Sequence, residues 1–67
     1  MTKNRLDILI KNAKQDLYTW FSYANVTSLK EFEQEQENIK SSSYHKYTDI
    51  VKHLQYIKKL ENLYAKL

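Results

Sequence analysis

The sequence predicts an all-α fold: a small three-helix bundle in which a long, a short and a long helix follow one another. The chain contains neither glycine nor proline, which disfavours hairpins, tight turns with positive φ and glycine-rich phosphate loops. Apolar residues recur at helical spacing, and charged residues make up 28% of the chain, an ordinary share for a folded protein. We therefore expect a single helical domain over residues 1–67, with helices at about 5–24, 29–39 and 44–66.

The first of these helices carries the strongest periodic signal. Asn4 is placed to cap it, and Asp7 falls in its first turn, where a carboxylate favours the positive end of the helix dipole. Asn25 can end it, because asparagine tolerates the left-handed conformation that usually falls to glycine. The side chains expected to face the core lie within about 120° of one another around the axis. They are Leu6, Leu9, Ile10, Ala13, Leu17, Trp20, Phe21 and Ala24.

The second helix is expected to be short and acidic. Ser28 and Glu31 have the spacing of a capping box, in which the serine bonds forward and the glutamate bonds back. Residues 41–43 are all serine and are expected to form the next connection and to cap the last helix. A helix of this length spans only about half of either neighbour. Its expected core residues are Leu29, Phe32 and Ile39.

The last helix is expected to carry two apolar seams and a polar ridge. The first seam is spaced as one face of a helix and should join the core; it comprises Tyr47, Ile50, Val51, Leu54, Ile57 and Tyr64. The second lies about 100 to 150° around the axis; it comprises Tyr56, Leu60, Leu63 and Leu67, with 4-3-4 spacing. Lys52, Lys59 and Lys66 form the ridge at steps of seven. A helix needs one apolar face to fold, so the second seam is surplus.

This second seam is expected to lie outside the core and to bind a protein partner or a second copy of the chain. An up-down-up order would place the last helix parallel to the first, so its late residues would lie near Trp20 and Phe21. Exposed apolar patches above a few hundred Å² usually mark interaction sites. The predicted protein interface consists of Tyr23, Tyr56, Leu60, Leu63 and Leu67. Dimerisation through the last helix is left open.

Contact with nucleic acid is a further expectation, either weak or assisted by a partner. The net charge is +3, with basic ends and an acidic middle. Lysines could follow phosphates, and exposed rings could stack or enter a groove. Against a sequence-specific helix-turn-helix stand the acidic second helix and the single arginine, since arginine leads base readout. The candidate contacts are Tyr44, His45, Lys46, Lys52, Lys59 and Lys66.

Catalytic and metal-binding chemistry is not expected. His45, Asp49 and His53 stand four residues apart, but together they span about 12 Å of helix, too far for one ion. The serines at 41–43 lack an orienting group and an oxyanion loop. Cysteine is absent, which excludes a disulfide framework and a cysteine zinc site. We expect no catalytic residue, metal, cofactor or small-molecule substrate.

These patterns predict a non-enzymatic small helical binding protein, an accessory subunit that docks on a larger nucleic-acid-handling protein. The alternatives are a small helix-turn-helix DNA-binding protein and a phage or mobile-element inhibitor of a host enzyme. Richness in asparagine, lysine, isoleucine and tyrosine, whose codons are AT-rich, is compatible with such a mobile element. No apolar run resembles a signal peptide or a membrane span, so we expect a cytoplasmic location and no membrane partner.

Overall fold

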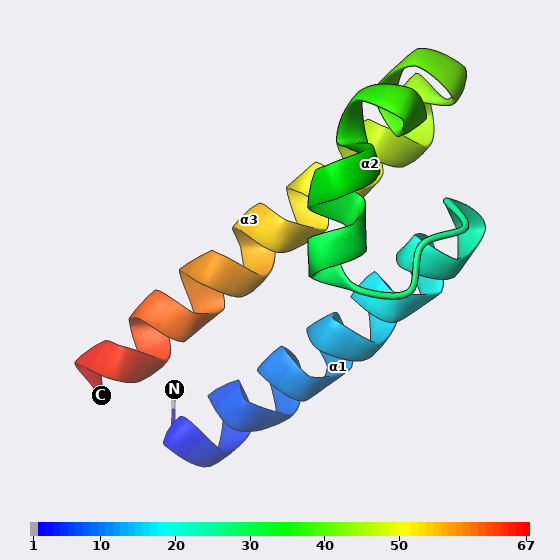
Figure 1. Cartoon of the computed structure of the whole chain (residues 1–67). Coiled ribbons are helices and arrows are strands. Elements are labelled where there is room, and N and C mark those ends of the chain that lie inside the picture. Colours follow the sequence, from blue (N-terminus) through cyan, green and yellow to red (C-terminus); the bar gives the residue numbers. More distant parts are fainter. Residues whose placement is uncertain (1) are drawn as a thin grey trace.

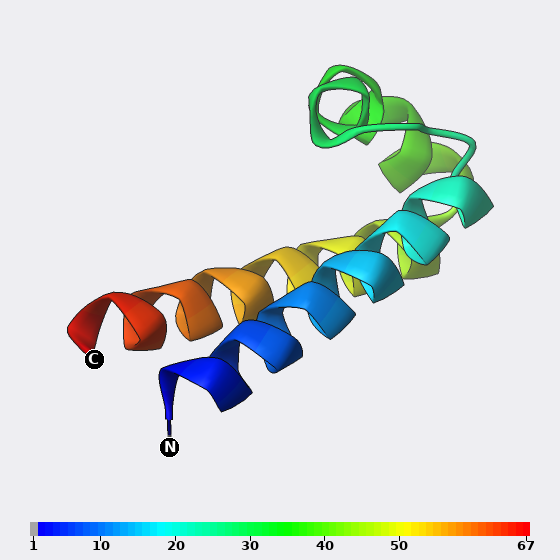
Figure 2. The same cartoon turned by 90° about the horizontal axis from the view of Figure 1, so that it is seen from below.

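The computed structural model of the chain describes residues 2–67, which form three α-helices. They are α1 (Lys3–Tyr23), α2 (Leu29–Ser42) and α3 (Tyr44–Lys66) (Figure 1). The predicted all-α three-helix bundle, with a long, a short and a long helix, is confirmed. α1 packs against α3, and α2 packs against α3 at the end farthest from the termini (Figures 1 and 2).

α1 begins two residues earlier than predicted, because Thr2 caps it and Asn4 does not. The Arg5 N–H donates to the Thr2 hydroxyl at 3.2 Å, and the Leu6 N–H donates to the Thr2 carbonyl at 3.1 Å. Threonine at this position satisfies amide groups that have no partner inside the helix. α1 therefore starts at Lys3, and not at residue 5 as a cap at Asn4 would require.

The predicted stop at Asn25 is confirmed. Asn25 has a φ of 60°, the left-handed conformation that ends many helices. Its N–H donates to the Ser22 carbonyl at 3.1 Å, and the Val26 N–H donates to the Phe21 carbonyl at 3.0 Å. This pair of bonds is a Schellman motif, and Val26 and Phe21, at the two positions whose side chains often meet in this motif, are both buried in the core.

α2 starts where the capping pattern placed it but ends three residues later. Ser28 accepts a hydrogen bond of 3.2 Å from the Glu31 N–H, whereas the Glu31 carboxylate bonds back to the Thr27 hydroxyl at 2.7 Å. The helix continues to Ser42, because nothing in the serine run breaks it. Only Ser43 separates α2 from α3. Ser43 occupies the cap position of α3, but its side chain makes no capping bond there.

α3 runs antiparallel to α1, so the predicted parallel arrangement is wrong. Rising residue numbers on α1 pair with falling numbers on α3. The Lys3 ammonium lies 5.4 Å from the centre of the Tyr64 ring, and the Trp20 and His53 rings lie 5.7 Å apart. The loop after α1 leads back toward the middle of the molecule, α2 runs outward again, and the turn at Ser43 returns α3 along α1 (Figure 1). The start of α1 and the end of α3 therefore lie at the same end of the molecule (Figures 1 and 2).

The core is one cluster drawn from all three helices. At its centre Phe32 of α2 stacks on Phe21 of α1 and on Tyr47 of α3, with ring centroids 5.8 and 6.1 Å apart. The predicted stripe of α1 is buried or packed against this cluster, as is the first seam of α3 except Tyr64. Leu29 is 43% exposed, so its prediction as a core residue is wrong. The buried apolar residues are Leu6, Ala13, Leu17, Phe21, Val26, Phe32, Ile39, Ile50, Ile57 and Leu60.

Candidate docking surface

The second seam of α3 is partly surface and partly core. We call Tyr56, Leu60, Leu63 and Leu67 the C-terminal seam. Tyr56, Leu63 and Leu67 are 47%, 46% and 57% exposed, whereas Leu60 is only 6% exposed. The expectation that the whole seam lies outside the core is therefore wrong at Leu60. Of the four residues, Leu60 stands closest around the helix axis to the buried Ile57, on the side that faces α1.

Tyr23 is exposed, but it lies at the other end of the helix pair from Leu63. The Lys46 ammonium, near the start of α3, donates a hydrogen bond of 2.8 Å to the Tyr23 carbonyl. Lys46 and Leu63 are about 25 Å apart along α3. Because α1 and α3 are antiparallel, the predicted interface divides into two regions and does not form the compact patch that was expected.

His53 connects these two regions. Its ring lies 5.7 Å from the Trp20 ring, which in turn packs edge-on against the Tyr23 ring at 5.8 Å. Three residues further along α3 stands Tyr56, and steps of four, three and four lead on to Leu67. Residues at such steps share one helix face. A strip with aromatic rings at one end and leucines at the other therefore runs along α3.

A row of cations lies beside this strip. Lys52, Lys59 and Lys66, which we call the lysine ridge, are exposed and lie about 70° around α3 from the C-terminal seam. The carboxylates that form ion pairs within residues 2–67 are Asp7, with Lys11, and Glu61, with Lys14. No carboxylate of this part of the chain pairs with the ridge.

The other predicted nucleic-acid contacts lie at the corner where α2 turns into α3. Tyr44 and His45 are exposed there, and the Tyr44 ring packs 6.4 Å from the Tyr47 ring. The Lys46 ammonium is already bonded to the Tyr23 carbonyl. The six predicted contacts therefore form two separate groups, one at this corner and one on the lysine ridge.

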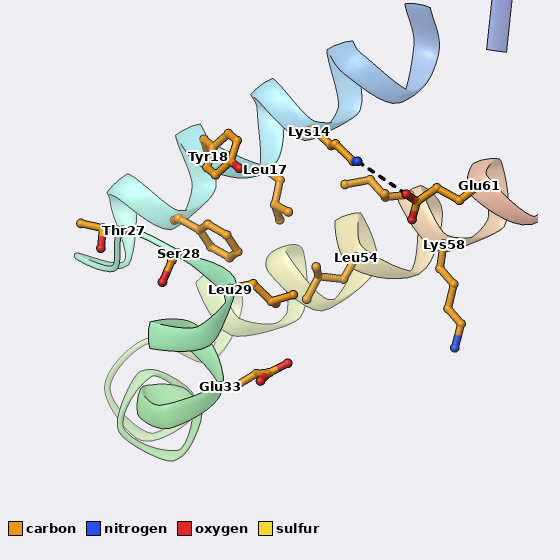
Figure 3. A pocket seen from close by; sticks show the side chains of 12 residues that line it. Lys14, Leu17, Tyr18, Thr27, Ser28, Leu29, Glu33, Leu54, Lys58 and Glu61 are labelled. Atoms are coloured by element: carbon orange, nitrogen blue, oxygen red, sulfur yellow. Dashed lines mark ion pairs between the residues drawn. The ribbon is translucent and has the colours of Figure 1, made fainter. Parts of the chain in front are cut away.

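A groove that the sequence did not predict lies on the side of α3 away from the seam. It opens where α2 begins, has a volume of about 750 Å³ and receives Leu17, Leu29 and Leu54 from the three helices (Figure 3). An ion pair of 3.5 Å between Lys14 and Glu61 crosses its end. Beyond this pair a second hollow of about 360 Å³ follows the same helix pair. The available signal was the short second helix, which left Leu29 without a neighbour to cover it.

Comparison with known proteins gave no match to a family model, a curated protein or a solved structure. Within residues 2–67, no helix has the length and apolar character that crossing a membrane would demand. Within the same range of residues, no three side chains of histidine, cysteine, aspartate or glutamate are grouped so that they could hold a metal ion. Fold and surface thus define an all-α protein of three helices with an apolar seam exposed on its last helix.

Proposed function

We propose that the chain is a non-enzymatic binding protein that docks on another protein through the C-terminal seam. The observation that carries this proposal is the exposure of Tyr56, Leu63 and Leu67 on one helix face. Apolar anchors at such spacing are how helices dock into grooves or against other helices. An exposed stripe of large apolar side chains is unfavourable in water, and a partner would remove it from solvent.

The position of Leu60 supports the proposal. Because Leu60 is buried in the core, it fixes the two helical turns between Tyr56 and Leu63 against α1. A surface of this kind loses little conformational entropy when it binds. A core of this size seldom provides more than about 3 to 5 kcal/mol, so binding of a partner to the folded state would also stabilise the domain.

The finer proposal is that this protein is an accessory subunit of a larger nucleic-acid-handling protein. The lysine ridge supports it, since Lys52, Lys59 and Lys66 have no carboxylate partner within residues 2–67. Such a ridge would orient the protein partner or hold nucleic acid near it. Direct contact with nucleic acid through the same ridge is the second candidate function.

A pair of double variants tests the docking proposal. Tyr56→Gln with Leu63→Gln removes two exposed anchors, whereas Ile8→Gln with Tyr44→Gln removes one aliphatic and one tyrosine side chain of similar exposure elsewhere. Immobilised wild-type chain should capture a protein from a lysate of the native host, and mass spectrometry would identify it. The purified partner should then bind the seam variant about tenfold or more weakly and the control variant like wild type.

Circular dichroism should show the same helix content in both variants, because the substituted side chains lie outside the core. The docking proposal would be contradicted if the seam variant kept full affinity for the captured protein, or if the two variants lost affinity equally.

A further inference from the structure

We infer that the partner of the C-terminal seam is an amphipathic α-helix whose apolar stripe is flanked by carboxylates, and not a second copy of this chain. The inference rests on the proposed function and adds the chemistry of the partner. It comes from two features of the same side of α3, namely the spacing of the seam and the lysine ridge beside it.

The spacing of the seam fits a helix. Its residues follow one another at steps of four, three and four, the alternation of a and d positions in a heptad repeat. Leu60 is buried in the core, so the positions open to a partner are Tyr56, Leu63 and Leu67. From Tyr56 to Leu67 the seam covers about 16 Å, or three helical turns. A partner helix with the same alternation could pack its apolar residues against the three exposed side chains of the seam.

The two edges of the seam differ in chemistry. In the heptad register of the seam, Lys52, Lys59 and Lys66 all fall at g, the position next to an a residue. The opposite edge holds Ile57, which is buried in the core, and Tyr64. A helix that lies in the seam would therefore have a row of ammonium groups along one side and α1 along the other.

Within residues 2–67, no carboxylate forms an ion pair with the lysine ridge. Glu61 bonds to Lys14 on the groove side of α3, at 3.5 Å. Asp49 stands three residues before Lys52, at the end of the strip farthest from Leu67, but it forms no ion pair with this lysine. Carboxylates at the flanking positions of a partner helix would supply the missing charges, as charged e and g residues do between paired helices.

A second copy of the chain lacks this chemistry. If two seams paired antiparallel, the g positions would meet and the two ridges would repel; if they paired parallel, each ridge would face Ile57 and Tyr64 of the other copy. The acidic helix α2 cannot fill the seam either. Its Phe32 and Ile39 are buried, and Leu29 is its one exposed large hydrophobic residue, so it offers no apolar stripe.

Two synthetic peptides test the inference. Each has about 18 residues and the same leucine stripe, and the flanking positions are all glutamate in one peptide and all lysine in the other. Fluorescence anisotropy with the wild-type chain at low salt should give a Kd for the glutamate peptide at least about tenfold below that for the lysine peptide. This preference should shrink toward about 1 M salt, where the Debye length is only about 3 Å.

Charge reversal on the ridge should reverse this preference. Lys52→Glu with Lys59→Glu changes two exposed positions, and lysine and glutamate have similar helix propensities. The matched control, Lys30→Glu with Lys58→Glu, changes the net charge by the same amount at exposed positions away from the seam. The control should keep the preference for the glutamate peptide.

Several outcomes would overturn the inference while leaving the proposed function in place. The first is equal affinity of the wild-type chain for the two peptides. The second is a reversal of the peptide preference by the control pair Lys30→Glu with Lys58→Glu. The third is a wild-type dimer in sedimentation velocity that becomes a monomer in the variant Tyr56→Gln with Leu63→Gln. Tighter binding of a duplex oligonucleotide than of the glutamate peptide, lost in the ridge variant, would assign the ridge to phosphates and also overturn it. The proposed function fails as well if three results are found together: neither peptide binds, the chain forms no dimer, and the seam captures no host protein.

Discussion

The ring of Phe32 stacks on the ring of Phe21, with their planes inclined by 28° and their centroids 5.8 Å apart. This contact joins α2 to α1, and the opposite neighbour of Phe32, Tyr47, joins α2 to α3. One side chain of the short helix therefore contacts both long helices. The placement of α2 depends strongly on it, because α2 contributes only one other buried residue, Ile39.

Phe32→Ala should leave the chain unfolded or nearly so. Truncation of a buried phenylalanine costs about 3 to 5 kcal/mol, which equals the whole stability expected of so small a core. Phe32→Leu keeps most of the apolar volume and should lower the free energy of unfolding by about 1 kcal/mol. Urea denaturation followed by circular dichroism measures both. An unfolding midpoint of Phe32→Ala equal to that of wild type would refute the central position of this ring.

Replacements at Asn25 should separate backbone conformation from side-chain contacts. Asn25→Ala should lower the free energy of unfolding by about 1 kcal/mol, because φ is 60° and a Cβ without a polar group is unfavourable there. Asn25→Gly fits this conformation and should stay within about 1 kcal/mol of wild type. Thermal unfolding of the two variants side by side provides the measurement. A glycine variant less stable than the alanine variant would contradict the expectation.

Leu60 and Leu63 should respond very differently to the same change. Leu60→Ala removes a buried side chain and should cost about 2 to 5 kcal/mol. Leu63→Ala removes a side chain that is already about half exposed, so the free energy of unfolding should fall by about 1 kcal/mol. Chemical denaturation of both variants tests this, with Ile8→Ala as a surface control. Equal losses at the two leucines would mean that Leu63 is more deeply packed than its exposure indicates.

Binding of nucleic acid through the lysine ridge should have a shallow salt dependence. Three lysines can neutralise three phosphates, so log K should fall with log salt with a slope of about −3 on duplex DNA. Lys52→Glu with Lys59→Glu should abolish the signal, and Lys30→Glu with Lys58→Glu should preserve most of it. Anisotropy with labelled oligonucleotides across a salt series measures the slope. If no binding is seen even at low salt, the second candidate function is removed.

Local patterns in the sequence predicted the helices well. The bounds of α3, the stop at Asn25 and the cap at Ser28 each follow from side-chain chemistry within a few residues, and these predictions are confirmed. Thr2 was missed because Asn4 is an equally good capping residue and periodicity alone cannot separate the two. The extra turn of α2 was missed because serines, although common at connections, do not forbid a helix.

The relative direction of the helices and the burial of individual side chains could not be predicted in the same way. Whether α3 runs parallel or antiparallel to α1 depends on how the loop after Asn25 aims α2 and on how α3 then packs against α1. Both depend on contacts between helices, such as that of Phe21 with Phe32, and not on patterns within one helix. Leu60 and Leu63 lie on the same seam, and only the side on which α1 lies decides that one is buried and the other is not. The groove beside Leu29 is likewise a product of tertiary arrangement.

The start of α1 lies beside the end of α3, and this also determines how the molecule would respond to force. Tension applied through the ends would pull α1 and α3 apart from the end where Lys3 covers Tyr64 toward the end where Trp20 meets His53. Such a geometry breaks contacts one after another, as in a zipper, and does not shear them all at once. The protein should therefore yield at low force, with α2 and its aromatic stack the last part to separate.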